Sequence, residues 1–132
     1  MASHVTYLVA SAGLCWVQLL SASLLHAKGW TPAGLQLAFG NREEMPPVTP
    51  LVGRAKRAAN NMVEAMVLLC AVMLAANMAD APARAIDRGA AVFFWSRVVY
   101  TLLYLGGVGY LRTAAWFASL GGIAMIGAAA LG

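Results

Sequence analysis

Charged residues are scarce in this chain, and acidic residues are fewer than basic ones. Of 132 residues only 11% are charged, with five Asp or Glu against nine Lys or Arg, whereas 61% are hydrophobic. A soluble domain of this length would need a far more polar surface. The composition therefore excludes an ordinary soluble domain and predicts a single-domain, all-helical integral membrane protein spanning residues 1–132.

Cysteines are few in this chain, and its cations form no basic tail. The two cysteines, Cys15 and Cys70, lie in apolar runs outside any CxxC or Cys/His cluster. Neither a metal site nor a disulfide framework is indicated, and we expect two buried free thiols. The formal net charge is +4, but the cations form no basic tail or stripe, which argues against a nucleic-acid partner.

Long apolar runs are what the sequence does have. A hydrocarbon core of about 30 Å requires about 20 apolar residues in helical form. Four stretches meet that length, so the expected fold is a four-transmembrane-helix bundle with spans near residues 5–27, 54–79, 85–105 and 113–131. The first is too long for a signal peptide and no basic segment precedes it, so we expect it to be retained.

The breaks between the spans carry turn residues. "KGWTPAGLQLAFGNREEMPPVTP" holds four of the five prolines and is expected to form a long loop, while "DAPAR" and "GGVGYLR" are expected to be short turns. Cations are concentrated near the long loop and the last turn: Lys28, Arg42, Arg54, Lys56, Arg57 and Arg112. The positive-inside rule therefore places the long loop in the cytoplasm and both termini outside it.

A polar stripe interrupts the second apolar run, in "GRAKRAANNMVEAM". At about 100° of turn per residue, Arg57, Asn61 and Glu64 share one face of a helix. Glu64 precedes an uninterrupted apolar run, residues 65–76, and so lies below the membrane interface. A carboxylate there is costly if it faces lipid, and normally faces the bundle interior or a wet cavity. The stripe indicates a functional site, with a structural ion-pair network as the alternative.

The third run carries a second stripe. In "SRVVYTLLYLG", Arg97, Tyr100, Thr101 and Tyr104 lie within about 100° of arc on one helix face. A buried Arg needs an acceptor, and Glu64 is the acidic residue that is followed directly by a long apolar run. We therefore predict that Arg97 and Glu64 face each other, either directly or through a ligand.

Together the two stripes predict a site for a small anion. Cations outnumber acids in the set that the stripes and the start of the last span contribute: Arg57, Arg97, Arg112, Glu64, Asn61, Tyr100, Tyr104 and Thr113. The ligand should be anionic but carry an ammonium group for Glu64, and an apolar second substrate could enter from the lipid. An Arg beside a thiol favours the nucleophilic thiolate. Such a site suits a peptide thiol that attacks a membrane-dissolved electrophile, among other anionic ligands.

These motifs resemble those of the MAPEG family, the membrane-associated proteins in eicosanoid and glutathione metabolism. The pattern R-x-x-R-x-x-x-N-x-x-E, present here as Arg54, Arg57, Asn61 and Glu64, is similar to the family signature. Arg97, Tyr100 and Tyr104 match the third-helix pattern R-x-x-[HY]-x-x-x-Y. "FGNRE" before "GRAKRAANN" resembles the bacterial branch and its microsomal-type glutathione transferases, which implies a bacterial inner-membrane location.

The resemblance implies a homotrimer of four-helix protomers that binds glutathione between subunits near the cytoplasmic face. The implied glutathione-binding residues are Arg54, Arg57, Asn61, Glu64, Arg97, Tyr100 and Tyr104. Some members place an Arg-Ser pair near the thiol, and Arg112 and Thr113 lie near that position, one residue short in spacing. The implied catalytic residues are Arg112, Arg97 and Thr113. The implied activity is a glutathione-dependent transferase or peroxidase acting on lipophilic electrophiles.

Two departures argue against eicosanoid synthesis. The first span has Gln18 and His26 but lacks the Arg that several eicosanoid-forming members use, and Ala59 and Asn60 stand where those members have Arg or His. Two other functions remain open on the sequence. One is a small four-helix proton-coupled multidrug exporter using Glu64, and the other is a non-catalytic trimeric membrane scaffold.

Overall fold

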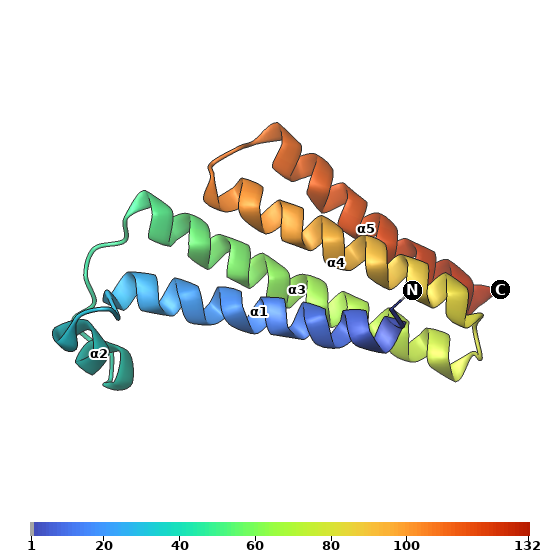
Figure 1. Cartoon of the computed structure of the whole chain (residues 1–132), viewed down its shortest axis with the longest axis horizontal. Helices are drawn as coiled ribbons and strands as arrows, with labels where there is room; N and C mark the ends of the chain where they lie inside the picture. Colours follow the sequence, from blue (N-terminus) through green and yellow to red (C-terminus); the bar gives the residue numbers. More distant parts are fainter. Residues whose placement is uncertain (1) are drawn as a thin grey trace.

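Five helices make up the protein, and four of them are long. The computed structural model describes residues 2–132. The helices are α1 (His4–Ala27), α2 (Pro32–Phe39), α3 (Pro50–Met78), α4 (Ala83–Leu105) and α5 (Tyr110–Leu131), and residues 2–132 contain no strand. Each long helix runs antiparallel to the long helix before it in the chain, so both ends of the chain lie at one end of the bundle (Figure 1). The expected all-helical fold is confirmed.

The long connection after α1 is not simply a loop, contrary to expectation. It contains α2, and α3 begins at Pro50 rather than near residue 54. Both helices start in the same way, with a Thr followed by a Pro. The side chain of Thr31 accepts a hydrogen bond from the Gly34 amide, and that of Thr49 accepts one from the Val52 amide. A Thr N-cap followed by Pro at the first helical position is a strong start signal.

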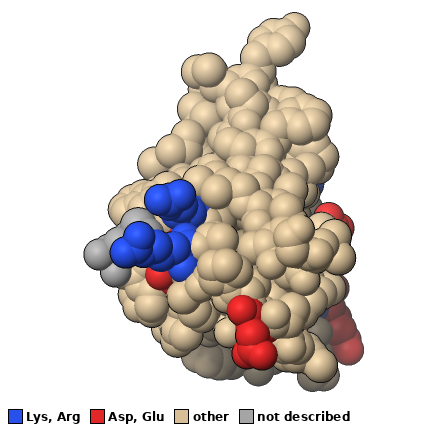
Figure 2. Space-filling view, turned by 90° about the vertical axis from the view of Figure 1, so that its right-hand side faces the viewer, with Lys and Arg blue, Asp and Glu red and all other residues tan. Residues whose placement is uncertain are grey.

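Membrane-spanning character is clearest in α1, α3 and α5. Among residues 2–132 these three helices are long and apolar enough to cross a membrane. The helix α4 has 23 residues, a comparable length, but it carries Arg84, Asp87, Arg88 and Arg97. Three of these charges lie in its first two turns, at the end of the bundle where both termini lie. Figure 2 views that end directly and shows blue and red patches on a mostly uncharged surface.

The core is built from apolar side chains of α3, α4 and α5, with α1 packed alongside. Its centre is fully buried: Met62, Leu69, Met73, Ile86, Phe93 and Ile126. Gly89 of α4 and Gly122 of α5 let these two helices touch through their backbones. A Cβ on Gly122 would lie 2.6 Å from the Gly89 carbonyl oxygen, and one on Gly89 would lie 2.7 Å from the Gly122 oxygen. Small residues at such contacts are typical of helix pairs in lipid.

The same two helices separate toward the other end of the bundle. Figure 1 shows α4 and α5 close together near the C-terminus and spread apart at the turn that joins them. That turn passes through Gly107, whose φ of +75° suits glycine. The polar residues of the two stripes lie toward this end of the bundle, on the first half of α3 and the second half of α4.

The start of α1 is attached to α4 by one carboxylate. Oδ1 of Asp87 accepts a hydrogen bond from the His4 backbone amide at 2.6 Å and lies 2.8 Å from His4 Nδ1. The contact joins residues 83 positions apart. It fixes the first turn of α1 against the bundle at the end that carries both termini.

The expectation that both cysteines are buried is wrong for this chain. Cys15 is half-buried and Cys70 is exposed. Cys70 lies on a face of α3 that borders a groove together with Val5 and Leu8 of α1. In a membrane this face meets lipid or another subunit rather than water, so an apolar surrounding is still available to the thiol.

Candidate functional site

Arg97 is the buried charge at the centre of the candidate site. Only 1% of its surface is exposed, and its Nη1 donates a 2.6 Å hydrogen bond to Oδ1 of Asn61 on α3. The guanidinium carbon also lies 5.0 Å from the centre of the Tyr100 ring. A buried guanidinium loses its hydration and needs acceptors, which the amide oxygen and the ring face provide in part. The Arg97 Nε has no partner among the described residues.

The predicted direct pairing of Arg97 with Glu64 is not formed. The register between α3 and α4 brings Asn61 level with Arg97, while Glu64 lies three residues further along α3. Three residues correspond to about 4.5 Å of helix rise, which is enough to separate the two groups. Glu64 is exposed on this chain. A contact through a ligand stays a prediction.

Two buried polar residues that the sequence analysis did not assign to the site form a hydrogen-bonded chain that ends on the Arg97 backbone. Nε2 of Gln18 on α1 donates to Oγ1 of Thr101 at 2.5 Å, and Thr101 Oγ1 donates to the Arg97 carbonyl oxygen at 2.7 Å. A polar chain thus runs from α1 through α4 to Asn61 on α3. The signal for Gln18 was present in the sequence, because an amide in the middle of an apolar span needs a partner.

A cavity of about 270 Å³ opens beside this buried arginine, between α3, α4 and α5. Its walls combine aromatic rings with hydrogen-bonding groups: Asn61, Tyr100, Tyr104, Arg112, Thr113 and Trp116. Trp116 was not predicted. It follows Thr113 by three residues and so lies on the same face of α5. The cavity therefore joins residues from both polar stripes to the first turn of the last helix.

Tyr104 is held between two arginines at the edge of this cavity. Nε of Arg57 donates to the Tyr104 hydroxyl oxygen at 3.1 Å. The guanidinium carbon of Arg112 lies 4.5 Å from the centre of the Tyr104 ring. Tyr100 packs edge-on against Tyr104, with 5.4 Å between ring centres. These contacts leave guanidinium N–H groups of Arg57 and Arg112 available to an anion.

Arg54 and Thr113 are placed differently. The Arg54 Nε donates to the Leu105 carbonyl oxygen at 3.2 Å, so this side chain ties the start of α3 to the end of α4. The Thr113 hydroxyl donates to the Gly109 carbonyl oxygen at 3.3 Å while its side chain lines the cavity. The structure thus gathers seven predicted residues and leaves two apart. The seven are Arg57, Asn61, Arg97, Tyr100, Tyr104, Arg112 and Thr113, and the two are Arg54 and Glu64.

Hydrogen-bond donors dominate the arrangement. Among residues 2–132 no group of three His, Cys, Asp or Glu side chains could hold a metal ion. The cavity itself is lined by one guanidinium group, that of Arg112, together with tyrosine and threonine hydroxyls. Two further guanidinium groups lie next to its walls: that of Arg57 contacts Tyr104, and that of Arg97 contacts Asn61. Chemically this set can bind an anion and stabilise negative charge that develops on it.

A helical bundle with apolar outer faces and a polar cavity near one end of its helices is an integral membrane protein with an internal polar site. The chain belongs to the MAPEG family: the family model matches residues 5–132, nearly the whole chain. No curated protein matches the chain. Membership places the protein among membrane proteins of eicosanoid and glutathione metabolism.

Proposed function

We propose that this protein is a glutathione-dependent membrane transferase or peroxidase that acts on lipophilic electrophiles, like the microsomal-type glutathione transferases it resembles. The observation that carries the proposal is the cavity beside Arg97, where the Arg112 guanidinium group and tyrosine and threonine hydroxyls face one space in a membrane-embedded protein. Glutathione has two carboxylates, one ammonium and one thiol, which matches a site with more cations than acids. Family membership supports the same co-substrate.

Each polar residue has a proposed role. Arg57, Asn61, Arg97, Tyr100 and Tyr104 bind glutathione, and Glu64 receives its ammonium group. The Nε of Arg54 is engaged by the Leu105 carbonyl, so we propose that Arg54 holds the end of α4 that presents Tyr104. Arg112 is the proposed partner of the thiol, because a nearby guanidinium lowers a thiol pKa and favours the thiolate. Thr113 adds a hydroxyl on the same turn.

The proposed reaction needs little from the protein beyond orientation and charge. The glutathione thiolate attacks the electrophile, a sulfur–carbon bond forms, and the leaving group departs with the bonding electrons. With a hydroperoxide, the thiolate attacks the terminal oxygen, the O–O bond breaks and the alkoxide leaves and is protonated to the alcohol. The glutathione sulfenic acid that remains reacts with a second glutathione to give glutathione disulfide and water. Holding both reactants in place and stabilising negative charge account for the rate increase.

The lipophilic reactant has a second cavity available. An apolar space of about 520 Å³ lies between α4 and α5, walled by residues such as Val99, Leu103 and Leu111. Like the polar cavity, it is lined by residues of the second half of α4 and the first half of α5. We propose that the electrophile approaches from this lipid-facing side.

A homotrimer would complete the site. Arg57 and Glu64 are exposed on the single chain, although both lie on a helix apolar enough to span a membrane. A carboxylate that faces lipid is costly, so a neighbouring subunit is the expected cover. We also propose that α4 is the fourth span, because it returns the chain between α3 and α5. In this topology both termini lie outside the cytoplasm of a bacterial inner membrane.

An ultraviolet difference titration of the detergent-purified protein with glutathione tests the proposal. A saturable thiolate band at neutral pH is expected, and S-methylglutathione, which lacks the thiol, should bind without producing it. Arg112→Gln should remove most of the band while binding heat persists. Arg84→Gln is the matched control, because Arg84 is an exposed cation at the opposite end of the bundle. Absence of both band and binding heat would refute the assignment.

One observation keeps a second function in view. Glu64 has no ion pair among the described residues and lies on an apolar helix, as the proton-coupling acid of a multidrug exporter would. A cavity with several arginines would repel cationic drugs, which favours the transferase. Dye efflux from proteoliposomes that depends on a proton gradient and is lost in Glu64→Gln would reverse this preference.

A further inference from the structure

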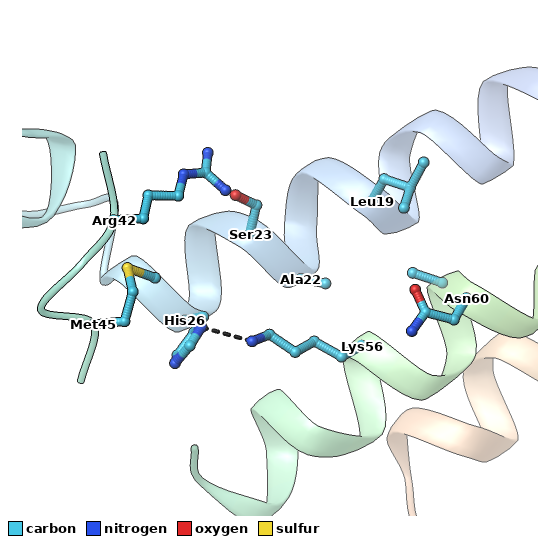
Figure 3. A pocket seen from close by; sticks show the side chains of 9 residues that line it. Leu19, Ala22, Ser23, His26, Arg42, Met45, Lys56 and Asn60 are labelled. Atoms are coloured by element: carbon cyan, nitrogen blue, oxygen red, sulfur yellow. Dashed lines mark hydrogen bonds between the residues drawn. The ribbon is translucent and has the colours of Figure 1, made fainter. Parts of the chain in front are cut away.

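A different cavity, of about 360 Å³, lies on the other side of α3 where α1 ends (Figure 3). It is formed by the last turns of α1, the first turns of α3 and the segment that follows α2. Its polar members are Ser23, His26, Arg42, Lys56 and Asn60. Asn60 faces this cavity while its neighbour Asn61 faces the candidate glutathione site, so the two spaces lie on different sides of one helix.

Lys56 is held in place by a neutral histidine. The Lys56 Nζ donates to His26 Nδ1 at 2.8 Å, and His26 Nε2 lies 2.8 Å from the Pro46 carbonyl oxygen. Because the carbonyl can only accept, Nε2 carries the proton and Nδ1 is the acceptor. The lysine ammonium thus uses one of its three N–H groups on His26, as the dashed line in Figure 3 shows, and keeps others for a ligand.

Arg42 enters from the opposite wall. Its Nε donates to the Ala38 carbonyl oxygen at 3.0 Å, near the end of α2, which orients the guanidinium. In Figure 3 the guanidinium points toward the Ser23 side chain on α1. The terminal amino groups of Arg42 and the ammonium of Lys56 therefore belong to one space.

No carboxylate lines this cavity. Glu43 and Glu44 follow Arg42 in the chain, but both are exposed and neither is among the lining residues. Two cations, each oriented by one hydrogen bond, stand here with hydroxyl and amide donors and no acid, which suits an anion site rather than an ion-pair network. The two cations stand on different elements, which suits a group with several acceptor oxygens.

The other walls of the cavity are apolar. Leu19 and Ala22 lie further into α1, away from the loop, and Met45 closes the loop side. Next to the cavity the connection that contains α2 exposes Trp30 and Phe39, at 69% and 88% of their surface. Exposed aromatic residues beside the end of a spanning helix are typical of the membrane–water interface. An occupant would therefore have an anionic head at the interface and an apolar body along α1.

We propose that this cavity binds the phosphate group of an anionic phospholipid, with Arg42 and Lys56 on the phosphate and an acyl chain along Leu19. The argument does not rest on the proposed glutathione chemistry. It rests on the cations, the absence of a lining acid, and the change from polar to apolar walls along α1.

Native mass spectrometry of the detergent-purified protein with equal amounts of phosphatidylglycerol and phosphatidylcholine, matched in acyl chains, tests the proposal. Phosphatidylglycerol should bind preferentially. Arg42→Gln and Lys56→Gln should each weaken its binding by about tenfold, the size expected for loss of a charge-assisted hydrogen bond. Ser23→Asp places a carboxylate beside Arg42 and should abolish the preference while a melting curve shows that the fold persists.

Arg88→Gln is the matched control, because it removes an equal charge at the opposite end of the bundle. It should leave phosphatidylglycerol binding unchanged, and glutathione binding heat should persist in Lys56→Gln. The proposal is overturned by equal binding of the two lipids or by an equal effect of Arg88→Gln. It is also overturned if glycerol 3-phosphate competes as well as the lipid, which would indicate a soluble phosphate ligand. Loss of glutathione binding in Lys56→Gln would assign the cavity to the glutathione site instead.

Discussion

The side chains of Arg97 and Asn61 join α4 to α3 through one short hydrogen bond, Nη1 to Oδ1 at 2.6 Å, inside the bundle. Arg97 is 1% exposed, and its Nε has no partner among the described residues. The buried cation is therefore satisfied only in part by the protein itself. A bound anion is one way to complete its hydrogen bonds. A substitution in this pair is therefore expected to change both the stability of the fold and the binding of a ligand.

Asn61→Leu should destabilise the fold and weaken glutathione binding together. The substitution keeps a side chain of similar size but leaves the buried Arg97 guanidinium without its amide acceptor, at a cost of about 1–3 kcal/mol in unfolding free energy. Thermal unfolding in detergent and binding heat measure the two effects. Asn60→Leu is the matched control, since the neighbouring amide is exposed and has no contact with Arg97. A destabilised Asn61→Leu that binds glutathione normally would show that Asn61 is a structural residue and not a glutathione ligand.

Gln18 and Thr101 should behave as a coupled pair. Thr101→Val removes the acceptor for the Gln18 amide and the donor to the Arg97 carbonyl, and should cost about 1–3 kcal/mol. Gln18→Leu in the same background removes the stranded amide, so the double variant should be less destabilised than the sum of the single variants. Unfolding free energies of all four proteins complete the cycle. Strict additivity would show that the two side chains do not interact.

Gly122→Ala should force α4 and α5 apart. The new Cβ would meet the Gly89 carbonyl oxygen at 2.6 Å and the Phe93 amide nitrogen at 2.7 Å, and backbone atoms cannot rotate away. A cost of about 1–3 kcal/mol is typical of such overpacking. The adjacent Gly121 has nothing within 4 Å of its Cβ position, so Gly121→Ala should be neutral or gain up to about 1 kcal/mol from helix propensity. Equal melting temperatures for the two variants would contradict the close contact.

Asp87→Ala should loosen the first turn of α1 without unfolding the bundle. It removes the acceptor for both the backbone amide and the ring of His4, a local loss of about 1 kcal/mol. Hydrogen exchange of the first amides of α1 should accelerate by about fivefold, the corresponding change in local opening. Asp80→Asn removes the same charge from the nearby turn and should leave this exchange unchanged. Unaltered exchange in Asp87→Ala would mean that other contacts hold α1.

The sequence was informative wherever a single helix decides the outcome. That Arg57, Asn61 and Glu64 share one helix face could be predicted from their spacing in a single helix. The burial of Arg97 could likewise be predicted from the apolar residues on either side of it. The choice of Asn61 over Glu64 as the acceptor depends on how far α3 is displaced along α4, which core packing around Met62 and Phe93 sets. No pattern within either segment encodes that displacement.

The error over α2 has a different origin. Thr31 and Pro32 give the same start signal as Thr49 and Pro50, but the surrounding glycines and prolines outweighed it, and eight residues are too few for a clear hydrophobic period. For Gln18 the sequence showed that a hydrogen-bond partner was needed but could not identify it. Its presence in an apolar span demanded a partner, but Thr101, 83 positions away, could only be found in three dimensions.

Gly89 and Gly122 form the point of closest approach between the two helices that carry Tyr104 and Arg112. Backbone atoms in direct contact allow little sliding there, so α4 and α5 can change their relationship mainly by tilting about that point. Because the cavity lies near the far ends of both helices, a small tilt at the glycines becomes a larger change in its width. The side-chain bulk at these two glycine positions therefore sets how far apart α4 and α5 stand at the end of the bundle where the cavity lies.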